Sequence, residues 1–146
     1  RRLVRNALRM RPDRIIVGES RGEEFFDLLQ AMNTGHAGSF TSIHANSPSE
    51  CFSRMESMCL MSGVELPLKA IREQMSTGIH YIVQLGRHPQ KGRIVSHVTE
   101  LGGMEGEVIL SQTLGKEKNG VLEATGLIPR RIDNLKAFGA SESLFT

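Results

Sequence analysis

Arg-Ile-Ile-Val-Gly-Glu, residues 14–19, is a short apolar run that ends in a glycine and a carboxylate. About twenty residues later a second run of similar type, Ser-Phe-Thr-Ser-Ile-His at residues 39–44, ends in a histidine. Both runs are typical of buried strands. In an open α/β sheet, ligands bind in the crevice outside the carboxyl ends of such strands. We therefore expect Glu19 and His44 to share one site, although they are far apart in the chain.

The composition is that of a folded domain. Of the 146 residues, 39% are hydrophobic and 23% are charged, which is enough for one domain with a real core. No apolar run approaches the roughly 20 residues that a membrane span requires, and no signal-like segment follows the basic start. We therefore expect a cytoplasmic protein. Cys51 and Cys59 lack metal-binding spacing and are predicted to be reduced structural thiols.

The charge pattern gives little support for nucleic-acid binding. The net charge is only +2, and a single tyrosine without any tryptophan leaves few aromatic side chains for base stacking. Arg1, Arg5 and Arg9 recur at a spacing that places them on one helix face. We expect that face to be solvated or to meet another subunit.

Periodicity predicts mostly helices in the first half of the chain and mostly strands in the second. The predicted helices cover residues 1–10, 22–32, 48–63, 67–77 and 129–138. Beyond the two strands already described, alternating residues predict an antiparallel meander over 79–85, 94–101, 107–110 and 121–124, with a loop at 115–120. We expect one compact unit with an α/β part at residues 1–78 and a β-rich part at residues 79–146.

Ser47-Pro48-Ser49-Glu50 is a typical helix start. Ser47 is predicted to be the N-cap and Pro48 the first helical residue. Glu50 would be the reciprocal capping-box partner, whose carboxylate accepts a hydrogen bond from the backbone amide of Ser47.

The strand that ends in Glu19 has the form of a Walker B element. A carboxylate at this place can bind the water shell of Mg²⁺ or polarise an attacking water. A solvated glutamate at a strand end is the alternative interpretation of this hexapeptide alone. Arg21 follows two residues later and could pair with Glu19 or with phosphate oxygens.

The second strand is unusually polar for a segment that enters a core. Thr41 and Ser42 precede His44, and Asn46 follows it. A lone histidine is usually structural, but at the functional end of a strand it could contact a γ-phosphate or its departing charge. Taken with Glu19, this segment favours a nucleotide site. Thr41, Ser42 and Arg21 are then further candidate contacts to the nucleotide.

Joined together, these segments resemble the type II/type IV secretion ATPases, and within that superfamily the CpaF/TadA pilus-assembly branch. Residues 8–19 look like the Walker B region of the family. Residues 32–36 and 42–48 are similar to its His box. Residues 103–106 and 124–130 also match the branch, so the likeness covers nearly the whole chain.

The resemblance implies an α/β fold: the C-terminal part of a RecA-like P-loop NTPase domain, followed by an antiparallel β meander and a short terminal helix. The complete protein would be a hexameric ATPase that uses ATP and Mg²⁺ to power pilus assembly or secretion. Its partners would be platform proteins at the cytoplasmic face of the inner membrane. Glu19 would act on Mg²⁺ through water, His44 would sense or stabilise the γ-phosphate, and Arg21 would support both. Ser20 departs from the family, which usually has a β-branched or apolar residue after the glutamate.

A larger departure is that no Gly-x-x-x-x-Gly-Lys-Ser/Thr motif occurs in these residues. The resemblance places that phosphate-binding loop ahead of residue 1, and its strand between the strand ending at His44 and the strand around residues 81–85. We therefore expect residues 1–146 alone to be inactive and strand 39–44 to have an open edge. Two alternatives stay open. One is a non-catalytic interaction module without its own P-loop, and the other is a DNA-translocating motor of the same fold, which the sparse aromatic and basic pattern disfavours.

Overall fold

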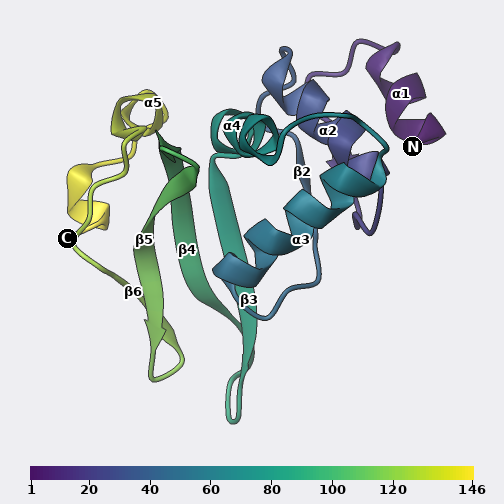
Figure 1. The fold of residues 1–146 in the computed structure, drawn as a ribbon. Coiled ribbons are helices and arrows are strands. Elements are labelled where there is room, and N and C mark those ends of the chain that lie inside the picture. The colour runs from purple at the N-terminus through teal and green to yellow at the C-terminus, as the bar shows by residue number, and fades with distance from the viewer. The chain divides into compact units, whose positions relative to one another are not determined.

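Two sheets that share no strand organise the structure, a computed structural model that describes residues 1–146. The first sheet pairs β1 (Ile16–Val17) with β2 (Phe40–Thr41) in parallel. The second sheet contains β3 to β6 in chain order (Figure 1). The chain divides into two units. Unit 1 comprises residues 1–79 and 104–109, and unit 2 comprises residues 80–103 and 110–146.

Unit 1 contains the predicted helices of the first half of the chain. They are α1 (Arg2–Leu8), α2 (Glu24–Asn33), α3 (Pro48–Met61) and α4 (Leu68–Gly78). Helix α2 contacts each of the other three. Its sequence explains this central place, because Phe25, Leu28 and Leu29 recur at helical spacing and are buried. These helices confirm the sequence-based assignment to within a few residues at each end.

Strand β1 has one covered face. Ile15, just ahead of the strand, packs with Val4 of α1 and with Leu28 and Ala31 of α2 in one buried cluster. Because successive side chains of a strand point to opposite faces, Ile16 points away from this cluster. The side chain of Ile16 is accordingly 65% exposed.

The N-terminus of α3 is capped largely as predicted. Ser47 Oγ accepts a hydrogen bond from the backbone amide of Glu50 at 3.1 Å, and Pro48 occupies the first helical position. The reciprocal half of the predicted capping box is different. The Glu50 carboxylate accepts from the backbone amide and the side-chain amide of Asn46, each at 2.9 Å, instead of from Ser47. Asn46 is the better partner because it offers two donors to the same oxygen.

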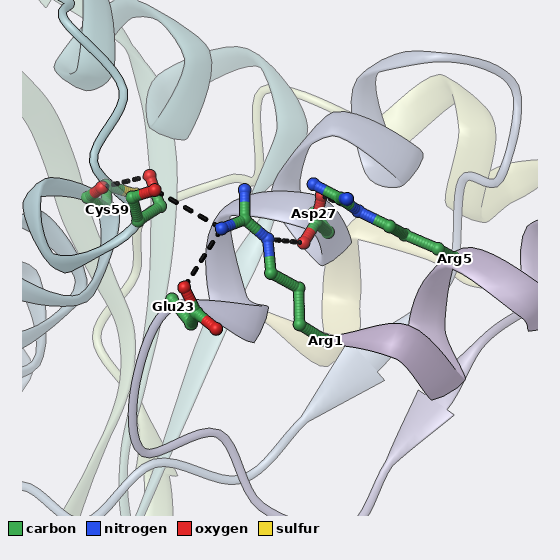
Figure 2. Close-up of polar contacts among 6 residues, drawn as sticks. Arg1, Arg5, Glu23, Asp27 and Cys59 are labelled. Atoms are coloured by element: carbon green, nitrogen blue, oxygen red, sulfur yellow. Dashed lines mark hydrogen bonds and ion pairs between the residues drawn. The ribbon is translucent and has the colours of Figure 1, made fainter.

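The arginine face of α1 does not point wholly to solvent. Arg1 Nε lies 2.7 Å from Asp27 of α2, and Arg5 Nε lies 3.1 Å from the other oxygen of the same carboxylate (Figure 2). Arg1 also pairs with Glu23 at 2.9 Å. The expectation of a solvated or subunit-facing stripe was therefore wrong for Arg1, whereas Arg5 is exposed as expected although it is ion-paired. A carboxylate on the neighbouring helix gathers both guanidinium groups and ties α1 to α2.

The cysteines are structural, as predicted. Cys51 and Cys59 are both free and buried. Burial raises the pKa of the Cys59 thiol to about 12, so this side chain stays protonated and unreactive at neutral pH. Two hydrogen bonds connect the backbone at Cys59 to Arg1 through Ser62. Ser62 Oγ donates to the Cys59 carbonyl at 2.6 Å, and the Ser62 carbonyl accepts from Arg1 at 3.3 Å (Figure 2).

Unit 2 takes most of the antiparallel meander. The sheet contains β3 (Tyr81–His88), β4 (Gly92–Glu105), β5 (Val108–Lys118) and β6 (Val121–Ala124), and it is followed by α5 (Ile132–Lys136) and the short 3₁₀ helix η1 (Glu142–Leu144). Strands β3 and β4 pair antiparallel, as do β5 and β6. The order of strands confirms the meander expected from the sequence.

The predicted loop at residues 115–120 is wrong. Strand β5 continues to Lys118, and Gly115 pairs with Ala124 inside the β5–β6 ladder. The turn itself is only Asn119-Gly120, with φ angles of 53° and 76°. Two consecutive positive φ angles define the tight hairpin turn for which Asn-Gly is the preferred sequence. This dipeptide is therefore a better marker of the turn than the preceding glycine and lysines.

The small sheet of unit 1 leaves an apolar edge uncovered, which leads to a first prediction. Strand β2 pairs with β1 alone, and Phe40, the register partner of Ile16, is 57% exposed. Exposed strand edges invite pairing with another chain. We expect the 146-residue chain to associate as its concentration rises. Phe40→Lys should weaken that association by about tenfold or more, the effect of removing one large apolar side chain from an interface.

Sedimentation velocity over a concentration series measures this association. Leu60→Lys is the matched control, because Leu60 is also exposed, at 52%, but belongs to α3 and not to a strand. A chain that stays monomeric throughout the series, or a Leu60 variant that dissociates as readily as the Phe40 variant, would contradict the prediction.

Candidate functional site

The carboxyl ends of β1 and β2 lie side by side. In the parallel register Ile16 pairs with Phe40 and Val17 with Thr41. Both strands are shorter than the runs at 14–18 and 39–44, but the backbone pairing extends beyond them. It continues ahead of the strands through Phe40 N to Ile15 O at 3.1 Å, and after them through Ser20 N to Ser42 O at 2.9 Å. The residues that follow each strand therefore leave the sheet at one edge.

Three predicted site residues meet at this edge. His44 Nε2 lies 3.0 Å from one oxygen of the Glu19 carboxylate, and Arg21 Nη2 lies 2.6 Å from the other oxygen. The Glu19 side chain is only 25% exposed, whereas those of His44 and Arg21 are 78% and 74% exposed. Glu19 thus lies at the bottom of the site. The side chains of His44 and Arg21 are largely in solvent. The expected proximity of Glu19 and His44 is confirmed.

The electrostatics of the site favour an ionised Glu19. The hydrogen bond from Arg21 lowers the pKa of the Glu19 carboxyl, burial opposes this, and the positive charges of Arg21, His44 and Arg54 lower the pKa further. The net pKa lies below the ordinary carboxyl range. Because protonation would begin only as the pH falls through that lowered value, Glu19 carries its full negative charge at neutral pH.

The hydroxyl groups predicted to contact a nucleotide are occupied within the protein. Ser42 Oγ donates to the Gly18 carbonyl at 2.5 Å. Thr41 Oγ1 lies 2.9 Å from Ser20 Oγ and 3.3 Å from the Ser42 carbonyl. These bonds fasten the end of β2 to the end of β1. Thr41 and Ser42 thus use their hydroxyl groups to join the two strand ends, and these groups are not free to bind a ligand.

Ser20 lies beside the site, and its contact was not predicted from the sequence. Its side chain is buried, with 1% exposed. The Thr41 hydroxyl across the sheet satisfies the buried hydroxyl of Ser20, as a buried polar group requires. The sequence signal that could have found this pair is the coincidence of two hydroxyl residues at matching strand ends.

A shallow hollow lies beside Arg21. Its volume is about 370 Å³, and it runs along one face of α3, where residues recur every three or four positions. The residues that line it are Arg21, Glu50, Ser53, Arg54, Ser57, Met58 and Met61. Arg54 was not singled out from the sequence. Arg54 follows Glu50 by four residues on α3, a spacing at which the two side chains of a helix often form a surface ion pair.

The residues at the strand ends fit a metal ion only in one way. No group of three or more His, Cys, Asp or Glu side chains could hold a metal directly. Glu19 is a single ionised carboxylate, and each of its oxygens keeps a second lone pair beyond the bond to Arg21 or His44. This chemistry fits contact with the water shell of Mg²⁺, an ion that usually keeps several waters in proteins.

Comparison with known proteins identifies relatives over most of the chain. The family model described as "Type II/IV secretion system protein" matches residues 1–117. A Mycobacterium tuberculosis protein named after conjugal transfer is 42% identical over 108 residues, which are 74% of this chain and 30% of that protein. The type IV secretion system protein VirB11 of Brucella suis is 38% identical over 100 residues, 66% of this chain and 28% of VirB11.

A solved structure agrees with these relatives. The crystal structure of the VirB11 ATPase from the Brucella suis type IV secretion system, in complex with sulphate, matches with a TM-score of 0.61 and 36% sequence identity. The match covers 66% of this chain and 31% of that one. The chain thus spans about 30% of the length of the curated relatives it matches. None of its helices is long and apolar enough to cross a membrane.

Proposed function

The chain belongs to the family of type II/IV secretion system proteins, and from this premise we propose that it is part of an ATPase that hydrolyses ATP to power secretion or pilus assembly. The observation that supports the proposal most directly is the pair of contacts that join Glu19 to His44 and to Arg21. The solved VirB11 relative is described as an ATPase and holds sulphate, which has the tetrahedral shape of a phosphate group. The relative's description as an ATPase favours phosphoryl chemistry for this chain too.

In the proposed mechanism each side chain has a separate task. Glu19 is ionised and accepts a hydrogen bond from the attacking water, which orients the water toward the γ-phosphate. His44 donates to the γ-phosphate oxygens as negative charge develops on them. Arg21 holds the Glu19 carboxylate in place through its 2.6 Å contact. Thr41 and Ser42 support the nucleotide site by fixing the strand ends that present these groups.

Mg²⁺ is the proposed metal cofactor, with Glu19 as its contact through water. The ion would neutralise charge on the phosphates of ATP. Glu19 is suited to this contact because its lowered pKa keeps it anionic, and because a quarter of its side chain remains accessible to solvent.

The finer assignments belong to the same proposal. We assign the chain to the CpaF/TadA pilus-assembly branch, on the motifs at residues 103–106 and 124–130. The working form would be a hexamer in the cytoplasm, held at the inner membrane by platform proteins. Residues 1–146 would form the C-terminal portion of the motor domain, with the site in residues 1–78. Alone they would not hydrolyse ATP, because they contain no Gly-x-x-x-x-Gly-Lys-Ser/Thr motif to hold the phosphates.

The role of His44 gives the test of this function. In the full-length protein, His44→Ala should lower kcat for ATP by about a hundredfold, the usual effect of losing one hydrogen-bond donor to a transition state. The fold should be unaffected, because the His44 side chain is 78% exposed. Steady-state ATPase assays with a melting curve for each variant measure both effects.

His97→Ala is the matched control, since His97 lies on β4, outside the site, and its ring has one hydrogen-bond contact, with the neighbouring Ser96 hydroxyl at 3.2 Å. Full ATPase activity in the His44 variant would remove His44 from the mechanism. Equal losses in the two variants would point to a general effect of replacing a histidine.

A further inference from the structure

Arg54 differs from the other arginines around the site because it has no partner. Arg21 is bound to Glu19, and Arg72 of α4 is bound to Glu56 at 2.7 Å. Arg54 forms neither a hydrogen bond nor an ion pair, although it is exposed on α3 and Glu50 lies one helical turn before it. The Glu50 carboxylate is engaged by Asn46. An unpaired guanidinium group therefore faces the hollow.

The hollow combines the groups that bind a phosphate. Arg21 and Arg54 supply positive charge, and the hydroxyl groups of Ser53 and Ser57 supply hydrogen-bond donors along the same helix face. Guanidinium groups recognise phosphate with paired N–H donors. Because Ser57 Oγ already donates to the Ser53 carbonyl at 2.9 Å, the Ser53 hydroxyl is the freer of the two.

The hollow and the Glu19 site share a charged residue. Arg21 belongs to both, since it contacts Glu19 and lines the hollow. The charge of Arg54 contributes to the lowered pKa of Glu19, after the larger contribution of Arg21. A group bound in the hollow would therefore lie within electrostatic reach of the proposed catalytic carboxylate.

We propose that this hollow is a phosphate-binding subsite and that Arg54 is the residue that binds the phosphate in it. The inference rests on the proposed ATPase function and deepens it. The group bound is either the terminal phosphate of the nucleotide or the inorganic phosphate released from it, which share the same chemistry. Arg54 draws the phosphate toward the side of the site where Glu19 and His44 act. Arg54 is the more available of the two guanidinium groups, because Arg21 is already bonded to Glu19.

The test compares Arg54→Gln and Arg54→Lys in the full-length protein. Arg54→Gln should raise the KM for ATP and weaken the binding of a fluorescent, non-hydrolysable ATP analogue by roughly tenfold to a hundredfold, as expected for losing a hydrogen bond between charged groups. Affinity for adenosine should not change. The triphosphate affinity of Arg54→Lys should fall between those of the wild type and Arg54→Gln, because lysine keeps the charge but loses the planar guanidinium group. The melting temperature should stay constant, since Arg54 has no partner to lose.

Lys69→Gln provides the matched control, because it removes the same charge from an exposed position on α4 that lies outside the hollow. Inhibition by inorganic phosphate separates the two sources of the ligand. If Arg54→Gln weakens only that inhibition, the subsite holds the released phosphate. If it weakens triphosphate binding, the subsite holds the nucleotide.

Unchanged triphosphate affinity and unchanged phosphate inhibition in Arg54→Gln would overturn the inference, even if Glu19 and His44 variants lose activity. Loss of adenosine affinity to the same degree would also overturn it, because the effect would not come from phosphate. If the wild-type protein binds the triphosphate through Arg54 but does not hydrolyse ATP, the proposed function fails and the phosphate subsite stands.

Discussion

Replacing Glu19 by glutamine in the full-length protein should reduce ATP turnover by roughly a thousandfold, within the 10²–10⁴ range of a lost catalytic acid or base. The amide has nearly the volume of the carboxylate and can still accept a bond from Arg21. It lacks the negative charge that polarises an attacking water. It also presents an amide N–H on one side, where Glu19 now meets His44 at 3.0 Å. Nucleotide binding and assembly should therefore be nearly intact while hydrolysis stops.

Single-turnover hydrolysis and nucleotide binding, measured on the same preparation, separate the two effects. Glu65→Gln is a suitable control, because Glu65 is an exposed carboxylate of unit 1 that forms no bond in the structure. A Glu19 variant that binds ATP poorly would assign Glu19 to binding. One that hydrolyses ATP at the wild-type rate would exclude it from catalysis.

The pairing of Glu19 with His44 could be predicted because it depends on strand geometry. Two apolar runs of the right length define parallel strands, and the residues that follow parallel strands must leave the sheet at the same edge. Neither the partner nor the distance between the two side chains was needed for that inference. For the same reason the helices of unit 1 could be predicted from the spacing of Phe25, Leu28 and Leu29.

Side chains whose meaning depends on three-dimensional neighbours could not be predicted in this way. Ser20 looked like a harmless departure, and only the structure shows its hydroxyl 2.9 Å from that of Thr41. The unpaired state of Arg54 could not be predicted either, because the sequence does not show that Asn46 takes the Glu50 carboxylate. Local spacing gives the possible partners of a charge, but competition among donors decides which partner is chosen.

Glu100 of β4 is the strongest example of such a hidden role, because nothing in the alternating strand pattern marks it. Its carboxylate is fully buried, with 0% exposed. One oxygen accepts from Gln112 Nε2 and from the backbone amide of Arg130, both at 2.8 Å. The other oxygen accepts from the backbone amide of Arg131 at 3.3 Å and lies 3.5 Å from the Arg131 guanidinium group.

These bonds place a negative charge at the start of α5. Arg131 is the N-cap of that helix and provides no side-chain cap of its own. Glu100 binds the backbone amides of Arg130 and Arg131, which lead into the helix, and so holds the start of α5 against β4. Burial raises the pKa of the Glu100 carboxyl, but the hydrogen bonds from Arg130, Gln112 and Arg131 outweigh it and hold the pKa below the ordinary value.

Glu100→Ala should destabilise unit 2 by about 3–5 kcal/mol, the cost of removing one partner from a buried ion pair. The alanine leaves the backbone amides of Arg130 and Arg131 without their acceptor, and Gln112 Nε2 keeps only its bond to the Ile128 carbonyl at 3.1 Å. Urea unfolding of the 146-residue chain measures the change. Tyr81 is the only tyrosine and there is no tryptophan, so its fluorescence reports on unit 2. Because Tyr81 Oη lies 3.5 Å from Glu100, each variant is compared by its unfolding midpoint and not by its absolute signal. Glu123→Ala, which removes an exposed carboxylate 3.9 Å from Lys118, should change stability by less than about 0.5 kcal/mol.

The pH dependence gives an independent check on the same carboxylate. A group whose pKa is lowered on folding contributes stability that is fully present above its unfolded pKa, about 4.3 for glutamate. That stability is lost as the pH falls through the lowered folded value. Wild-type unit 2 should therefore weaken in this acidic window more steeply than Glu100→Ala, which has no such carboxylate to protonate. Parallel losses in both proteins would mean that Glu100 is not the group that titrates, and an unchanged unfolding midpoint at neutral pH would mean that its bonds do not hold α5 in place.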